Sequence, residues 1–172
     1  RRSIYYQQPM LKQLMKPLVP SVKSVLIAGA ADAGILHVLS SIFDKSVRYQ
    51  AVDICNAPGE EMRHYAAQND LSLEFKQVPL QDYVPDQVFD LIFISNTLIY
   101  LQPDQAKQTL RQLQSGMHAN SSVVCGMRYV QEGDVDTPER KADLIRDMVI
   151  SISKIPDRIK REVYIKECSR IM

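Results

Sequence analysis

The sequence has few cysteines, no tryptophan and no long apolar run. Its three cysteines, Cys55, Cys125 and Cys168, are far apart and form no CxxC pair. Because an odd count argues against a disulfide framework, we expect a cytoplasmic protein in which Cys55 and Cys125 are buried apolar groups. A membrane-spanning helix needs about 20 apolar residues. No run in the chain approaches that length, so we expect no contact with a membrane.

An excess of charge of one sign is also missing. The 172 residues include 21 Lys and Arg against 20 Asp and Glu, which leaves a net charge of +1. Nucleic-acid-binding domains usually carry a clear positive excess, so no nucleic acid partner is expected. The sequence contains no HExxH motif, no paired cysteines and no clustered carboxylate loop, so we expect no metal site.

The sequence does contain a regular alternation of short apolar runs and amphipathic stretches. Strands are predicted over 24–28, 47–54, 71–78, 88–95 and 121–127, and helices over 5–18, 33–43, 59–68 and 103–117. Continuous apolar strands joined by helices form parallel sheets that are covered on both faces. The predicted fold class is therefore α/β, with a doubly wound, mostly parallel sheet and helices on both faces.

The end of the first predicted strand carries the first sign of a ligand. The strand runs into Gly29, and the spacing Gly29-x-Ala31-x-x-Gly34 departs by one residue from the dinucleotide-binding fingerprint. Asp53 stands at the end of the second predicted strand. A carboxylate at that place can accept two hydrogen bonds from the hydroxyls of an adenosine ribose. The combination predicts an adenosine-containing ligand at the carboxyl ends of the strands.

Asp32 helps to choose between two adenosine ligands. In a dinucleotide site this turn faces a pyrophosphate, which a neighbouring carboxylate would repel. S-adenosylmethionine carries no phosphate, and its sulfonium and ammonium groups are cationic. An acid in the turn therefore favours S-adenosylmethionine over NAD. Capping of the following helix by the Asp32 side chain is an equally good interpretation, and the two roles are compatible.

Three segments carry a family resemblance: Val25-Leu26-Ile27-Ala28-Gly29, Val52-Asp53-Ile54, and the stretch 89–98 with its Phe-Asp-Leu-Ile strand and Ser-Asn pair. Together they resemble the class I S-adenosylmethionine-dependent methyltransferases over about residues 20–130. The resemblance implies a Rossmann-like methyltransferase fold and S-adenosylmethionine as cofactor. The cofactor-binding residues that it implies are Gly29, Ala30, Ala31, Asp32, Gly34, Asp53, Ile54, Leu80, Gln81, Ser95 and Asn96.

Departures from the family pattern keep two other functions open. Ile27 stands where the family usually has an acid, and Ala31 and Ala33 replace glycines. The first hypothesis is a methyltransferase that acts on a small-molecule acceptor. The second is an NAD(P)-binding oxidoreductase, favoured by the glycine spacing. The third is a non-catalytic methyltransferase-like domain that binds a partner, favoured by the departures.

No catalytic base can be assigned from the sequence. His37 and His64 fall inside predicted helices, and His118 is expected to cap the helix predicted to end near residue 117. Tyr100 follows the Ser-Asn pair, where an acceptor would approach, and packing of the next helix is its simpler role.

We expect one domain over 1–172, with a leading helix over 1–20, a cofactor-binding core over 21–130 and a helical tail over 131–172. We expect this tail either to line the substrate site or to be an incomplete end of the fold.

Overall fold

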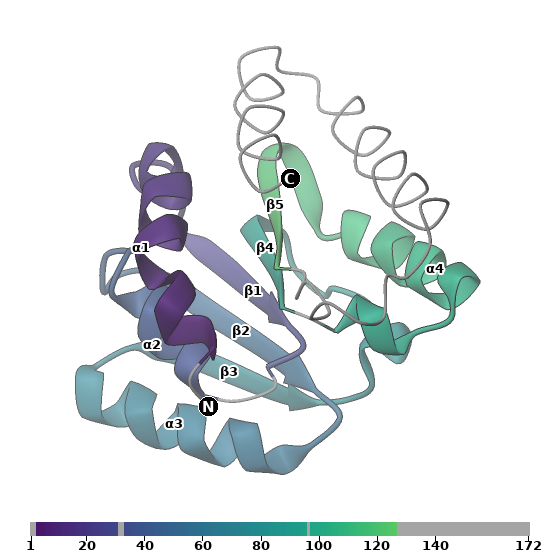
Figure 1. Ribbon diagram of the computed structural model, residues 1–172, viewed down its shortest axis with the longest axis horizontal. Coiled ribbons are helices and arrows are strands. Elements are labelled where there is room, and N and C mark those ends of the chain that lie inside the picture. Colours follow the sequence, from purple (N-terminus) through teal and green to yellow (C-terminus); the bar gives the residue numbers. More distant parts are fainter. Residues whose placement is uncertain (1–2, 31–32, 96, 127–172) are drawn as a thin grey trace. The chain divides into compact units, whose positions relative to one another are not determined.

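The computed structural model describes residues 3–30, 33–95 and 97–126 (Figure 1). The helical tail predicted over 131–172 lies outside these residues, as do Ala31, Asp32 and Asn96 of the predicted cofactor site. The described part alternates strands and helices along the chain. Its elements are α1 (Ser3–Met15), η1 (Lys16–Leu18), β1 (Ser24–Ala28), α2 (Gly34–Ser40), β2 (Arg48–Asp53), α3 (Asn56–Asn69), β3 (Ser72–Gln77), η2 (Leu80–Asp82), β4 (Phe89–Ser95), η3 (Leu98–Tyr100), α4 (Pro103–Gln114) and β5 (Met117–Gly126).

The strands form one sheet in the order β3-β2-β1-β4-β5, and every neighbouring pair is parallel. The chain first winds outward from β1 to β3, then returns across the sheet to place β4 on the other side of β1. This arrangement confirms the predicted doubly wound parallel sheet. Ligands in such sheets bind beyond the carboxyl ends of the strands where the winding reverses, which here is the gap between β1 and β4.

Side chains of alternate strand residues divide the core into two layers, because successive residues of a strand point to opposite faces. On one face, Val25 and Ile27 of β1 pack with buried residues of α1, α2 and α3. On the other face, Leu26 and Ala28 pack with η2 and with Leu113 of α4. Helices therefore cover both faces, as predicted.

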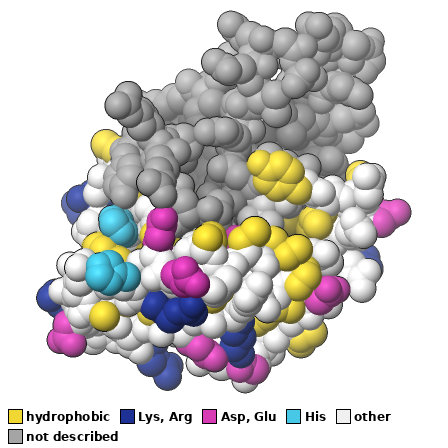
Figure 2. All heavy atoms as spheres, turned by 90° about the horizontal axis from the view of Figure 1, so that it is seen from below, with side chains coloured by type: hydrophobic (Ala, Val, Ile, Leu, Met, Phe, Trp, Pro, Cys, Tyr) yellow, Lys and Arg dark blue, Asp and Glu magenta, His cyan; other side chains and the backbone are white. Residues whose placement is uncertain are grey.

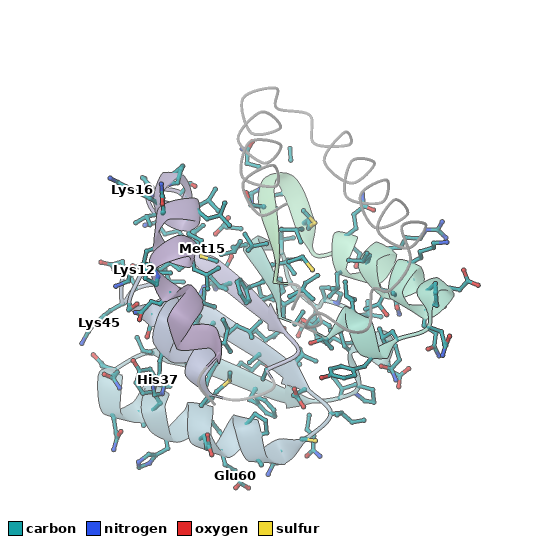
Figure 3. All side chains as sticks on the ribbon, viewed as in Figure 1. Lys12, Met15, Lys16, His37, Lys45 and Glu60 are labelled. Atoms are coloured by element: carbon teal, nitrogen blue, oxygen red, sulfur yellow. The ribbon has the colours of Figure 1, made fainter. Side chains whose placement is uncertain are left out.

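The first helix shows how its sequence divides between the core and solvent. Met15 is fully buried, whereas Lys12 and Lys16 are exposed. Figure 3 shows Met15 turned toward β1 and the two lysines pointing away from the sheet. The helix predicted over 5–18 contains Pro9 but ends at Met15, shortly before Pro17. Residues 16–18 form a 3-10 turn instead.

Several element boundaries differ from the prediction. α3 begins at Asn56 instead of residue 59, because Pro58 falls in its first turn, where a missing N–H is tolerated. α4 ends at Gln114, and Ser115 Oγ donates to the carbonyl of Gln112 at 2.6 Å. β5 accordingly starts at Met117 instead of residue 121.

Three expectations about individual side chains were wrong. Cys55 and Cys125 are both exposed instead of buried, since one follows β2 and the other lies near the end of the edge strand β5. His118 lies within β5 and caps no helix. Across the described residues, no helix combines the length and apolar character that crossing a membrane requires.

Candidate cofactor site

The turn after β1 has a backbone conformation that favours glycine. Gly29 has a φ of +83°, in the left-handed region that other residues rarely adopt. The N–H groups of Gly29 and Ala30 both donate to the carbonyl of Val52, at 2.9 and 3.2 Å. The turn is therefore fastened to β2 directly before Asp53.

The loop after β4 closes over the same turn. A Cβ atom built on Gly29 would lie 1.7 Å from the Oγ1 atom of Thr97. Thr97 Oγ1 also donates to the carbonyl of Ala28, at 3.4 Å. The residue at position 29 must therefore be glycine for two reasons, its φ angle and the side chain that occupies the space beside it.

Asp53 ends β2 and is partly exposed. Its Oδ1 atom accepts a hydrogen bond from the N–H of Cys55 at 2.8 Å, which helps to start α3. The Asp53 carbonyl accepts the N–H of Val78 at 3.0 Å, and this bond ties the end of β3 to the end of β2. Backbone N–H groups thus bond to both the side chain and the main-chain carbonyl of Asp53.

Ile54 has an unusual environment for a large apolar residue, because it is 62% exposed. Its carbonyl accepts a hydrogen bond from Gln77 Nε2 at 3.3 Å. Ile54 directly follows Asp53 in the chain. Figure 2, which views the molecule from below Figure 1, shows hydrophobic and acidic side chains side by side on that face of the molecule. An apolar group beside a carboxylate suits a ligand with a flat base and a sugar diol.

Leu80 and Gln81, the two site residues predicted in the loop after β3, differ in their exposure to solvent. Leu80 is 4% exposed and packs in the core with Val52 and Ile94, so its side chain has little surface for a ligand. Gln81 is partly exposed. The fully buried Gln50 fixes this loop, since Tyr83 donates a hydrogen bond to Gln50 Oε1.

Four predicted site residues share the carboxyl edge of the sheet with the turn. Asp53 ends β2 and Ser95 ends β4, while Gly34 begins α2 and Ala30 is buried in the turn itself. Thr97 was missed by sequence reasoning, because no spacing shows that it would lie against Gly29. A glycine at a strand end signals only that something approaches closely, not which residue does so. Within the described residues, no group of three or more His, Cys, Asp and Glu could hold a metal.

Tyr100 ends the short turn η3 after β4 and is 83% exposed. The simpler sequence interpretation, in which it packs the start of the next helix, is therefore wrong. α4 begins at Pro103 and is capped by Gln102, whose side chain and that of Gln105 each bond to the other residue's backbone. The tyrosine is left with its ring in solvent on the side where β4 ends.

Comparison with solved structures identifies the fold. N-methyltransferase NodS from Bradyrhizobium japonicum matches with a TM-score of 0.64 and 15% identity, over 84% of this chain and 81% of that chain. The sugar N-methyltransferase KedS8 from Streptoalloteichus matches with a TM-score of 0.60 and 14% identity, over 79% of this chain and 53% of that one. An S-adenosylmethionine-dependent methyltransferase from Clostridium acetobutylicum matches with a TM-score of 0.57 and 14% identity, over 70% of this chain. The chain spans 49% of that protein's length.

The chain thus has the Rossmann-like fold of the S-adenosylmethionine-dependent methyltransferases, which confirms the resemblance predicted from its sequence. No curated protein matches the sequence. A family model for the DnaB-helicase binding domain of primase matches residues 127–172. Those residues follow the described part of the chain.

Proposed function

We propose that this chain binds S-adenosylmethionine at the carboxyl edge of β1, β2 and β4 and methylates a small-molecule acceptor. The observation that carries the proposal is the coupling of the Gly29 turn to Asp53 through Val52. One carbonyl accepts two N–H groups of the turn, and the next residue supplies the carboxylate. A ligand that contacts both would join an adenosine ribose at Asp53 to a group near the turn.

The hydrogen bonds of the turn engage two N–H groups that a phosphate ligand such as NAD could otherwise use. Phosphate-binding turns hold their ligand with free backbone N–H groups. The N–H groups of Gly29 and Ala30 already donate to Val52, and Thr97 lies against the turn. These two N–H groups are therefore not available to a pyrophosphate.

In this proposal each part of the ligand has its own protein contacts. Asp53 accepts hydrogen bonds from the ribose hydroxyls, and the exposed side chain of Ile54 provides apolar surface for the adenine. Gln81, with its amide donor and acceptor, suits the edge of the base, while Leu80 contributes through its backbone. The resemblance assigns the backbone around Ser95 to the methionine part, while Gly34 lets α2 pack close to the sheet. The predicted contacts of Ala31, Asp32 and Asn96 lie outside the described residues.

The bound cofactor would supply a methyl group already activated by its sulfonium. The protein therefore needs mainly to orient the acceptor and keep water away from it. Tyr100, exposed after β4, is placed to contact an acceptor. The solved structures with this fold include a sugar N-methyltransferase and an amino pentose methyltransferase, which supports a small amine as the first acceptor class to test.

Substitutions of Asp53 test the proposal, because its negative charge can be removed without its hydrogen bond to the Cys55 N–H. Asp53→Asn keeps an oxygen that can accept the Cys55 N–H but removes the charge, whereas Asp53→Ala removes both. We expect both variants to bind S-adenosylhomocysteine at least about tenfold more weakly, which corresponds to about 1.4 kcal/mol. Asp104→Asn, at an exposed acid of α4, is the matched control. Unchanged affinity of Asp53→Ala would rule out the assigned site.

A second candidate function has one observation in its favour. Residues 127–172 match the helicase-binding domain of primase, which suits a methyltransferase-like domain that binds a partner protein. Purified DnaB helicase, titrated with the whole chain, would test it. Binding of the helicase without any affinity for S-adenosylhomocysteine would replace the enzyme proposal. A single domain that works in the cytoplasm, without a metal, nucleic acid or membrane partner, stays a prediction.

A further inference from the structure

We infer that Thr97 is a positioning residue that holds the cofactor turn in its binding conformation. This inference rests on the proposed function, since it concerns the affinity of the same site. Thr97 follows β4, whereas the turn follows β1, so the contact joins the two strands between which the winding of the sheet reverses.

The side chain of Thr97 fits closely against Gly29. A Cβ atom on Gly29 would lie 1.7, 2.7 and 2.9 Å from the Oγ1, Cβ and Cγ2 atoms of Thr97. Three atoms of one side chain thus surround the place that a side chain at position 29 would take. The threonine fills the space that the glycine leaves open.

Glycine alone would not fix the turn, because it adopts positive and negative φ angles with similar ease. The observed φ of +83° is therefore selected by contacts. Val52 provides them on the β2 side, through the hydrogen bonds from Gly29 and Ala30. Thr97 provides them on the β4 side. A turn held from both sides loses its freedom on folding, so that less conformational entropy remains to be lost when a ligand binds.

The space that Thr97 fills can be tested apart from its hydroxyl. Valine has nearly the same shape as threonine, so Thr97→Val keeps side-chain atoms in the space beside Gly29. We therefore expect Thr97→Val to bind S-adenosylhomocysteine within about threefold of the wild type. Thr97→Ala, which removes the Oγ1 and Cγ2 atoms beside Gly29, should bind about tenfold more weakly.

A size exchange between the two residues gives the sharpest test. Gly29→Ala places a methyl group on Thr97, and we expect it to lower the affinity for S-adenosylhomocysteine by at least about tenfold. Thr97→Gly alone should also lower it. In the double variant the threonine atoms are gone, so adding Thr97→Gly to Gly29→Ala should raise the affinity. A loss equal to the sum of the two single effects would overturn the inference.

Two matched variants control for changes in stability alone. Gly116→Ala brings a new Cβ to 2.6 Å from Pro85 Cβ, in the connection from α4 to β5. It should lower the melting temperature and leave the affinity unchanged. Thr109→Val makes the same exchange as Thr97→Val at a fully buried threonine of α4, whose Oγ1 has no hydrogen-bond partner within the described part of the chain. It should not lower the melting temperature and should leave the affinity unchanged. If the wild type binds no S-adenosylhomocysteine, the proposed function fails and this inference fails with it.

Discussion

Asp90 of β4 is joined to Ser24 of β1 by three hydrogen bonds at the amino edge of the sheet. Asp90 Oδ2 accepts the N–H and the Oγ hydroxyl of Ser24 at 2.9 and 3.0 Å, while the Asp90 N–H approaches Ser24 Oγ at 3.1 Å. The N–H of Lys23 donates to the same Oδ2 at 2.8 Å. The acid of the Phe-Asp-Leu-Ile stretch therefore fixes the relative position of the two central strands, at the edge opposite the proposed cofactor site.

His118 completes this cluster from β5. The Asn120 N–H donates to His118 Nδ1 at 3.1 Å, so Nδ1 carries no proton. The proton is therefore on Nε2, which donates to Asp90 Oδ1 at 2.9 Å. The histidine thus links β5 to β4, a tertiary role that sequence spacing does not reveal.

The first prediction concerns the dependence of stability on pH. Burial raises the pKa of Asp90, but the hydrogen bonds from His118, Lys23 and Ser24 outweigh it, so the pKa lies below the usual value. A carboxyl with a lower pKa in the folded state stabilises the fold above the unfolded pKa of about 3.9. That contribution is lost as the pH falls through the folded-state pKa.

We therefore expect Asp90→Asn to lower the free energy of unfolding by about 1–3 kcal/mol at pH 7. Urea unfolding at pH 7, 5 and 3 measures this. The difference from the wild type should shrink at the lowest pH. The same difference at all three pH values would contradict the role given to the charge, and Asp104→Asn on exposed α4 is the control.

The second prediction concerns the buried Gln50, which is 1% exposed. Tyr83 donates to its Oε1 atom, and Nε2 donates to Glu74 Oε2 at 2.6 Å. Tyr83→Phe would leave the buried oxygen without its partner, at a cost of about 1–3 kcal/mol. Thermal unfolding should show a lower melting temperature for Tyr83→Phe. The same exchange at Tyr100, which is 83% exposed, should leave it unchanged, and equal effects of the two would contradict this account.

The third prediction sets helix propensity against packing at Gly59. Glycine to alanine in a helix normally stabilises by about 1 kcal/mol. A Cβ on Gly59 would lie 2.4 Å from the ring of Phe75, and such overpacking costs about 1–3 kcal/mol. Gly59→Ala should therefore destabilise the protein, as measured by urea unfolding. Phe75→Leu, combined with it, should restore part of the loss, and a more stable Gly59→Ala would show that the ring gives way.

The fourth prediction separates ligand binding from stability at Ile54. Because the side chain is 62% exposed, Ile54→Ser should leave the melting temperature unchanged. In the proposed site it should weaken the binding of S-adenosylhomocysteine several-fold, through lost apolar contact with the adenine. Val88→Ser, at a residue 50% exposed before β4, is the matched control and should change neither quantity. Equal affinities of both variants and the wild type would remove Ile54 from the site.

Much of the fold could be predicted from the sequence because its strands are continuous apolar runs. The first strand was predicted with its observed ends, 24–28, and the strongest, β4, within one residue. Helix ends were predicted less well, because they depend on single capping contacts. The hydroxyl of Ser115, which bonds to Gln112 as α4 ends, is one of them.

The site was harder to predict, since it is assembled from loops that follow different strands. Gly29 and Asp53 each carry a local signal, a glycine and an acid at a strand end. The hydrogen bonds through Val52 and the contact with Thr97 depend on the order of strands in the sheet, which no short motif encodes. Cys55 is exposed because it lies just beyond the end of β2, and no short motif in the sequence marks that end.

Calorimetric titration of the purified protein can show whether this edge of the sheet binds S-adenosylmethionine. S-adenosylmethionine, S-adenosylhomocysteine and NAD would each be titrated into the same preparation. We expect micromolar binding of the first two, no binding of NAD, and binding of S-adenosylhomocysteine at least about tenfold weaker in Asp53→Ala. Binding of NAD alone, or of none of the three, would contradict this expectation.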